Sequence, residues 1–243
     1  MRRNHRHLLR LATVLAMFLA VSLAAAAAPS EPLLAREAPD WAELIGPPPA
    51  PDSRQAHEDL AILLWVQRTR SKSDADRIWA AVSPGVGSFQ QAIGTILLPE
   101  QYPKLYAAVQ DALDASTPVF STLKSKWKRP RPTSIDPRVE PCTPTPSSGS
   151  YPSGTAMLGV VAGRLLADLI PTRQEGIRAR ADEIAELRVA AGVHFPTDVE
   201  AGSKLGEALA DEILASEGWA SRRAALADEL AILENRLQGA GTR

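Results

Sequence analysis

The sequence contains very little cysteine and histidine. Of its 243 residues one is cysteine, Cys142, and four are histidine. A single cysteine excludes an internal disulfide framework and a zinc site built from several cysteines. If the first 27 residues are removed, only His57 and His194 remain as imidazoles. Any reaction that needs an imidazole therefore has two candidates.

Aromatic residues and strand-like patterns are also scarce. Aromatic residues make up 5% of the chain, whereas apolar residues make up 45%. This composition, rich in alanine, favours closely packed helices over a sheet of β-branched and aromatic residues. We find no sustained apolar–polar alternation and no repeat of about 20 to 50 residues. The chain is therefore predicted to be folded, all-α and organised as one domain.

The longest apolar run lies at the N-terminus. A basic head, residues 1–10, precedes an apolar run, residues 11–23, and then a run of alanine, residues 24–28. This order is typical of a secretory signal peptide; the alternative is a membrane anchor, but a span takes about 20 apolar residues. We therefore expect residues 1–27 to be a cleaved signal peptide. The mature protein is then periplasmic or secreted, with no stable membrane insertion.

Basic residues are slightly fewer than acidic residues, and they are unevenly distributed along the chain. The chain has 27 Lys and Arg against 28 Asp and Glu, and loss of the first 27 residues would leave 23 against 28, a net charge of −5. A mildly acidic chain binds nucleic acid poorly, so no nucleic-acid partner is expected. Residues 124–138 nevertheless form a basic island with Asp136 as their single acid, which indicates a local anion site or, alternatively, a solvated loop. Its members are Lys124, Lys126, Lys128, Arg129, Arg131 and Arg138.

Proline divides the rest of the chain. Residues 28–54 are rich in proline and are predicted to form an irregular arm, followed by one helical domain over residues 55–237 with about six to eight helices. Pro118 should kink or divide a helix, and the proline-rich residues 128–152 should form a functional loop. Helical patterns begin at residue 55 and cover residues 74–82, 88–97, 100–127, 153–169, 172–193, 196–216 and 220–237.

Three segments carry residues suited to chemistry. In the last of them, His194 and Asp198 are four residues apart across a helix start, and Arg188 precedes them. A carboxylate at this spacing can hold one ring nitrogen and leave the other free to attack. The alternative is a structural histidine beside a proline turn.

The two earlier segments supply groups that bind anions. Ser153, Gly154 and Thr155 are expected at a helix N-terminus, where free N–H groups attract an anion, although an ordinary helix cap would look the same. Lys124 and Arg131 lie seven residues apart in the basic island. Guanidinium and ammonium groups bind phosphate oxygens, although a surface basic loop is the alternative.

Together the segments resemble the signature of the PAP2 phosphatase superfamily, with the order Lys-x6-Arg-Pro, Pro-Ser-Gly and Arg-x5-His-x3-Asp. Over residues 55–216 the chain is most similar to the soluble bacterial branch, the class A nonspecific acid phosphatases. Residues 141–144, 149–151 and 198–202 add to the resemblance. It implies an all-α fold.

The resemblance also implies a two-step displacement of phosphate esters. His194 would attack phosphorus and form a phosphohistidine, and Asp198 would orient the ring. Charge on the phosphoryl oxygens would be stabilised without a metal or a cofactor, and the substrates would be small-molecule phosphate esters. The residues implied in holding these oxygens are Lys124, Arg131, Ser153, Gly154 and Arg188.

Thr155 is the main departure from the family. The Pro-Ser-Gly motif normally continues with a histidine that protonates the leaving oxygen, and a threonine hydroxyl is a far weaker acid. General acid catalysis contributes about 10²- to 10⁴-fold, so Thr155 in this catalytic position should restrict turnover to activated leaving groups. His57 could replace the missing acid; the alternative is a solvated surface histidine.

Two further departures concern the loop and the third motif. Leu187 stands where relatives usually have serine. A loop cysteine in relatives can pair with a cysteine near the third motif, but the chain has Ala190 and Ala191 there. Cys142 is therefore expected to be a free thiol.

Three functions remain open from the sequence. The first is a periplasmic acid phosphatase of broad range, and the second is a protein that binds phosphate or phosphoesters with weakened turnover. The third is vanadate-dependent halide oxidation, since related haloperoxidases use a similar cradle. The sequence does not identify the physiological substrate or the pH optimum. It also leaves open whether the protein forms a homo-oligomer, because the last helix could pack on its own domain or on a partner.

Overall fold

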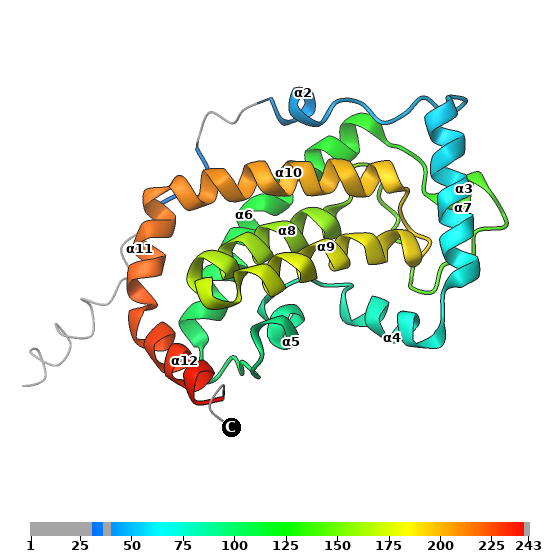
Figure 1. Cartoon of the computed structure of the whole chain (residues 1–243). Coiled ribbons are helices and arrows are strands. Elements are labelled where there is room, and N and C mark those ends of the chain that lie inside the picture. The colour runs from blue at the N-terminus through cyan, green and yellow to red at the C-terminus, as the bar shows by residue number, and fades with distance from the viewer. Residues whose placement is uncertain (1–30, 36–39, 241–243) are drawn as a thin grey trace, which may run out of the picture. The chain divides into compact units, whose positions relative to one another are not determined.

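Caps and prolines set the helix boundaries in the computed structural model, which describes residues 31–35 and 40–240 (Figure 1). Every regular element among these residues is a helix and none is a strand, which confirms the all-α class. The predicted signal peptide, residues 1–27, lies outside the described residues. The helices are α2 (Trp41–Ile45), α3 (Arg54–Thr69), α4 (Lys72–Ala80), η1 (Val86–Phe89), α5 (Gln90–Ile93), α6 (Pro103–Trp127), α7 (Pro132–Ile135), α8 (Gly154–Leu169), η2 (Pro171–Arg173), α9 (Gln174–Ala190), α10 (Pro196–Ala215), α11 (Glu217–Ala225) and α12 (Ala227–Ala240).

Helix α8 is the most buried element. It packs against α6, α9 and α10, which lie alongside it in Figure 1. Small residues allow the close approach: a Cβ atom on Gly163 would lie 2.7 Å from the Cβ of Ala181 in α9. Removal of apolar surface from water is the largest favourable contribution to folding, and close packing of this kind increases it. The tight packing fixes the N-terminus of α8, where the Pro-Ser-Gly motif lies.

The helices near the predicted site begin where the sequence predicts. Ser153 caps α8, and its Oγ accepts a hydrogen bond from the Ala156 amide at 3.3 Å. Pro196 occupies the first turn of α10, where its missing N–H costs no hydrogen bond. Both starts, and the end of α8 at Leu169, confirm the expected boundaries.

Of the two outcomes expected at Pro118, a kink or a division, the division is wrong, because α6 runs through this proline as one helix of 25 residues. A proline inside a helix costs about 3 kcal/mol. Leu113 and Leu123, on either side, are both buried in the core, and the burial of a leucine side chain contributes about 1.5 to 3 kcal/mol. Packing of both halves therefore outweighs the local defect.

The described part of the chain contains eleven α-helices, more than the six to eight expected. The predicted C-terminal helix is divided at Leu226, which is buried in the core, into α11 and α12. The predicted helix over residues 88–97 consists of η1 and α5, and Gly94 ends α5 with a φ of 86°. The segment over residues 172–193 begins as η2 before α9.

The predicted irregular arm contains helix α2 in its described part. Asp40 caps this helix by accepting hydrogen bonds from the Ala42 amide at 3.0 Å and the Glu43 amide at 3.1 Å. The Tyr151 hydroxyl donates to the carbonyl groups that end it, at Ile45 and Gly46. The arm is thus bound to the segment that leads into α8.

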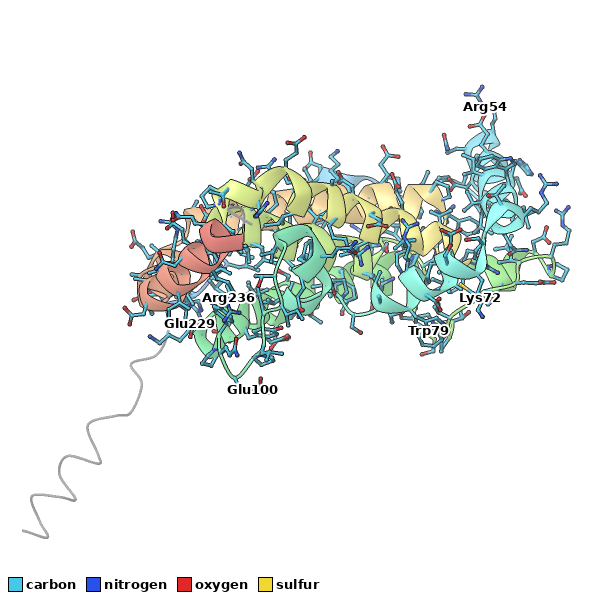
Figure 2. The ribbon with its side chains drawn as sticks, turned by 60° about the horizontal axis from the view of Figure 1, so that its bottom comes forward. Arg54, Lys72, Trp79, Glu100, Glu229 and Arg236 are labelled. Carbon is cyan, nitrogen blue, oxygen red and sulfur yellow. The ribbon has the colours of Figure 1, made fainter. Side chains whose placement is uncertain are left out.

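The C-terminal helix packs on its own domain. The Glu229 carboxylate, labelled in Figure 2, accepts hydrogen bonds from the amides of Lys104 at 3.0 Å and Leu105 at 2.9 Å, in the first turn of α6. A carboxylate at a helix N-terminus is stabilised by the free N–H groups there. Leu233 of α12 is buried in the core. None of the described helices is long and apolar enough to cross a membrane.

Candidate active site

His194 lies in the short connection between α9 and α10. Its side chain is 3% exposed. The Nε2 atom lies 2.9 Å from Arg131 Nη1, and the Nδ1 atom lies 3.5 Å from Asp198 Oδ2. The connection turns at Gly192, with a φ of 76°, where a Cβ atom would also lie 3.2 Å from the Pro141 Cα. Glycine at this position therefore brings the histidine to both partners.

The proton of His194 is assigned from these contacts. Arginine only donates hydrogen bonds, so the Nε2 atom that faces Arg131 must be the unprotonated nitrogen and Nδ1 carries the hydrogen. Burial lowers the pKa of His194 to about 3; the Asp198 charge acts in the opposite direction, whereas the charges of Arg131 and Lys124 lower it further. His194 is therefore a neutral imidazole with a lone pair on Nε2.

Asp198 is fully buried and ionised. Its Oδ2 atom accepts a hydrogen bond from the Phe195 amide at 2.9 Å, and its Oδ1 atom accepts one from Arg129 Nη1 at 2.6 Å. Burial acts to raise the pKa of this carboxyl, but His194, Arg129 and the Phe195 amide outweigh it and lower the pKa below its ordinary value. A charge beside the protonated Nδ1 atom can stabilise an imidazolium.

Arg129 and Asp59 were not predicted as site residues, although both are buried here. Arg129 Nη2 donates to Asp59 Oδ2 at 2.9 Å, and Arg129 Nη1 also donates to Thr197 Oγ1 at 2.8 Å. Thr197 in turn donates to Asp59 through its hydroxyl and its amide. Asp59 lies in α3 four residues before the buried Leu63, so the two side chains lie on the same face of the helix. A carboxylate on this apolar face is the signal from which the sequence could have indicated a buried site residue.

Two buried cations, Lys124 and Arg131, lie near the histidine. Lys124 Nζ donates to the carbonyl groups of Gly149 at 2.6 Å and Ser150 at 3.2 Å. Arg131 donates to the carbonyl groups of Ser148 and Val193, each at 2.9 Å. Burial, and then the charge of Arg131, lowers the pKa of Lys124 to about 7.

Mutual repulsion among the cations extends to Arg188. Burial lowers the pKa of Arg131 to about 10 against the opposing charge of Asp198, and the charge of Arg188 lowers it further. Arg188 is 3% exposed, and its Nε and Nη1 atoms have no hydrogen-bond partner among the described residues. Buried donors without acceptors are costly, so these donors and the clustered positive charge favour an anion between them.

The Pro-Ser-Gly motif is joined to the third motif through the backbone. The Ser153 amide donates to the Asp198 carbonyl at 2.8 Å. A Cβ atom on Gly202 of α10 would lie 2.4 Å from the Ser153 carbonyl oxygen, so glycine permits this approach. Gly154 is buried at the first position of α8, and a Cβ atom there would lie 2.8 Å from the Phe120 ring. The α8 N-terminus is thus fixed beside the helix that carries Asp198.

Thr155 follows Gly154 and is half-buried. Its hydroxyl makes no hydrogen bond to any described residue, so nothing in the contacts assigns it a proton-transfer role. His57 is exposed on α3, as expected for a solvated histidine. Cys142 is a free thiol, as predicted, and its amide donates to the Ala191 carbonyl at 3.1 Å.

A cavity of about 670 Å³ adjoins the cations. Lys124 and Arg131 line it, together with residues from the end of α6 and from the loop around residues 145–149. His194 does not line it but contacts Arg131, which does. Arg131 is therefore a neighbour of both the cavity and the histidine.

Comparisons with known proteins agree with this architecture. Residues 108–220 match the model of the PAP2 superfamily. An acid phosphatase of Zymomonas mobilis subsp. mobilis is 30% identical over 65% of this chain and 63% of its own length. A non-specific acid phosphatase of Providencia stuartii is 26% identical over 68% of this chain and 70% of its own length. The chain thus spans less than two thirds of the Zymomonas protein.

Two solved structures share the fold at low sequence identity. A transmembrane PAP2-type phosphatidylglycerolphosphate phosphatase from Bacillus subtilis superposes with a TM-score of 0.52 and 22% identity, over 72% of this chain and 90% of its own. A bacterial vanadium-dependent iodoperoxidase superposes with a TM-score of 0.55 and 18% identity, over 69% of this chain and 52% of its own. Both confirm the helical architecture.

Proposed function

Because residues 108–220 match the model of the PAP2 superfamily, we propose that the protein is a phosphomonoesterase of the acid phosphatase type that works through a phosphohistidine at His194. The observation that carries the proposal is the lone pair on His194 Nε2, 2.9 Å from Arg131 Nη1 and beside a cluster of buried cations. A neutral imidazole is the form that attacks phosphorus, and the cations provide the charge that a phosphoryl group needs.

Substrate binding would satisfy the unpartnered donors. A phosphoryl group between His194 and Arg131 would accept hydrogen bonds from Arg131, from Arg188 and from Lys124. Ser153 and the Gly154 amide at the α8 N-terminus would complete the cradle. The phosphoryl group would take the place that Arg131 Nη1 now holds against Nε2.

The reaction would proceed in two displacements. His194 Nε2 attacks phosphorus, the bond from phosphorus to the leaving oxygen breaks, and the leaving oxygen takes a proton from water. The phosphorylated ring is an imidazolium, and Asp198 stabilises its charge from the Nδ1 side. Water then attacks the same phosphorus, its proton passes to solvent, and the broken P–N bond returns the lone pair to Nε2.

An acidic pH range for the proposed activity would follow from the pKa values of two groups. His194 has a pKa lowered to about 3 and stays a nucleophile in mild acid, whereas Lys124 has a pKa lowered to about 7 and loses its charge in mild alkali. Phosphate binding by Lys124 would therefore weaken above neutral pH. We propose a periplasmic or secreted location, supported by the N-terminal sequence pattern and the bacterial relatives.

A second candidate function rests on Thr155. Its hydroxyl is a poor acid, and loss of general acid catalysis costs about 10²- to 10⁴-fold. A protein with this loss could still bind phosphate or phosphoesters through its cations. His194 and Asp198 favour turnover, since binding alone needs no activated nucleophile.

Hydrolysis of para-nitrophenyl phosphate by the purified protein between about pH 4 and pH 8 separates the two functions. His194→Ala removes the nucleophile, and His57→Ala, at an exposed histidine, is the matched control. The proposal requires turnover by wild type and by His57→Ala, and none by His194→Ala. Phosphate binding by calorimetry without turnover in any of the three proteins would favour the binding function.

A further inference from the structure

A second cavity, of about 620 Å³, is formed by other residues than those of the proposed active site. Its volume is in the range of sites for small organic ligands. Residues of α3, α4, α9 and α10 line it, and Figure 1 shows α3 and α4 beside the end of α9 and the start of α10. None of Lys124, Arg131, Arg188, His194 and Asp198 lines this second cavity, and it shares no lining residue with the cavity of about 670 Å³. The proposed phosphatase reaction therefore leaves this space unused.

The inner part of the second cavity is apolar. Leu187 and Val199 line it and are buried, and Val66 and Pro196 line it and are half-buried. Ile62 of α3 also lines the cavity, and its side chain is 46% exposed. Apolar surface that stays in contact with water is stabilised when a ligand covers it. The lining thus favours a ligand with an apolar body.

The charged groups of the lining have an excess of negative charge. They are the four carboxylates of Asp74, Glu183, Glu186 and Glu200 and the two guanidinium groups of Arg70 and Arg77, so their net charge is −2. Arg77 forms ion pairs with Asp74 and Glu183. Arg70 donates hydrogen bonds to the carbonyl groups of Ala190 at 2.9 Å and Glu140 at 3.1 Å. Both guanidinium groups of the described lining therefore already have acceptors within the protein.

Two carboxylates of the lining are left without such a partner. Glu186 of α9 and Glu200 of α10 are exposed, and neither side chain makes an ion pair or a hydrogen bond with a described residue. Because these carboxylates are exposed while Leu187 and Val199 are buried, the negative charge lies nearer the mouth of the cavity than the apolar residues do. A ligand that matches this arrangement has an apolar body and a positively charged end.

From this arrangement we infer that the second cavity binds a small organic cation, an ammonium group attached to an apolar body. The apolar body would cover Ile62, Leu187 and Val199. The ammonium group would donate hydrogen bonds to the carboxylates of Glu186 and Glu200. A carboxylate or phosphate ester of the same size would be repelled by these two groups. The inference goes beyond the proposed function and does not depend on phosphatase activity.

Titration calorimetry of the purified full-length chain with octylammonium, octan-1-ol and octanoate tests the inference. The three probes share one apolar chain and differ in charge. We expect one molecule of octylammonium to bind per chain, about tenfold more tightly than octan-1-ol, because two exposed carboxylates together contribute about that much. Octanoate should bind more weakly than octan-1-ol. The advantage of octylammonium should shrink at high salt, because exposed charges are screened.

Variants of the lining test the charged and the apolar parts separately. The double variant Glu186→Gln and Glu200→Gln should abolish the roughly tenfold advantage of octylammonium and leave the affinity for octan-1-ol unchanged. Glu175→Gln, at an exposed glutamate of α9 that does not line the cavity, is the matched control. Ile62→Asn should weaken the binding of octylammonium and of octan-1-ol alike. Its control is Ile96→Asn, at an exposed isoleucine outside the cavity.

Three results would overturn the inference. The first is equal affinity of the wild type for octylammonium and octan-1-ol, or no binding of either probe. The second is an undiminished advantage of octylammonium in the double glutamine variant. The third is equal affinity of Ile62→Asn and Ile96→Asn for octylammonium. Each of these results leaves the proposed phosphatase function untouched, because hydrolysis of para-nitrophenyl phosphate tests that function separately.

Discussion

Arg129 donates a hydrogen bond of 2.6 Å to Asp198, and both side chains are buried. The same guanidinium donates to Asp59 at 2.9 Å, so a helix outside the matched superfamily region is joined to the carboxylate beside His194. Negative and positive charges alternate along the contacts that lead from Asp59 through Arg129 and Asp198 to His194, once the His194 ring is protonated or phosphorylated. We therefore expect Asp59 to act as a positioning residue, through Arg129.

Asp59→Asn tests this positioning. The amide has the same size but no charge, so Arg129 is held less firmly against Asp198. We expect kcat to fall about 10- to 100-fold with KM little changed, because a small displacement of a catalytic group is that costly. Steady-state kinetics with para-nitrophenyl phosphate, and a melting curve for folding, measure the effect. Glu58→Gln, at the exposed neighbouring position, is the control, and equal kinetics in the two variants contradict the prediction.

The pH dependence of kcat/KM reports the free enzyme. His194, with a pKa lowered to about 3, is unprotonated above that pH, and Lys124, with a pKa lowered to about 7, is charged below that pH. Activity should therefore hold in mild acid and fall as the pH rises through about 7. Lys124→Arg keeps a charge in alkali, so it should move this fall to higher pH. The same alkaline fall in Lys124→Arg and in wild type would show that Lys124 is not its cause.

Thr155→His restores an imidazole at the α8 N-terminus. We expect turnover of glycerol 2-phosphate to rise by about 10²-fold or more, because an imidazole can protonate an alkoxide. The gain should be far smaller for para-nitrophenyl phosphate, whose leaving group is a weaker base. Thr155→Val, which removes the hydroxyl alone, is the control. Loss of activity in Thr155→Val comparable to that of His194→Ala would mean that the Thr155 hydroxyl has a catalytic role of its own.

Gly202→Ala tests the contact between α10 and the Pro-Ser-Gly motif. The added methyl group would lie 2.4 Å from the Ser153 carbonyl oxygen, which is backbone and cannot turn aside. Overpacking of this kind costs about 1 to 3 kcal/mol, so we expect a lower free energy of unfolding and weaker phosphate binding. Gly85→Ala is the control, since its Cβ atom would meet nothing within 4 Å and its φ of −175° suits alanine. Chemical denaturation and calorimetry should distinguish the two variants.

The sequence predicted the features that depend on neighbours along the chain. The start of α8 at Ser153 and the four-residue spacing of His194 and Asp198 are local, so caps and helix geometry specify them. The division of a helix that was one of the outcomes predicted at Pro118 does not occur, because tertiary packing of α6 overrides a local defect. The pairing of Arg129 with Asp59 joins residues 70 positions apart, and no spacing rule could indicate it.

The central claim is that His194 becomes phosphorylated, and rapid quench into alkali followed by mass spectrometry tests it most directly. Alkali is chosen because a phosphohistidine is lost in acid. The account predicts a phosphoryl group on the peptide that contains His194 during turnover of para-nitrophenyl phosphate. It predicts none in His194→Ala, and more of it in any variant that slows the attack of water. Steady turnover with no phosphoryl group on His194 would contradict the account.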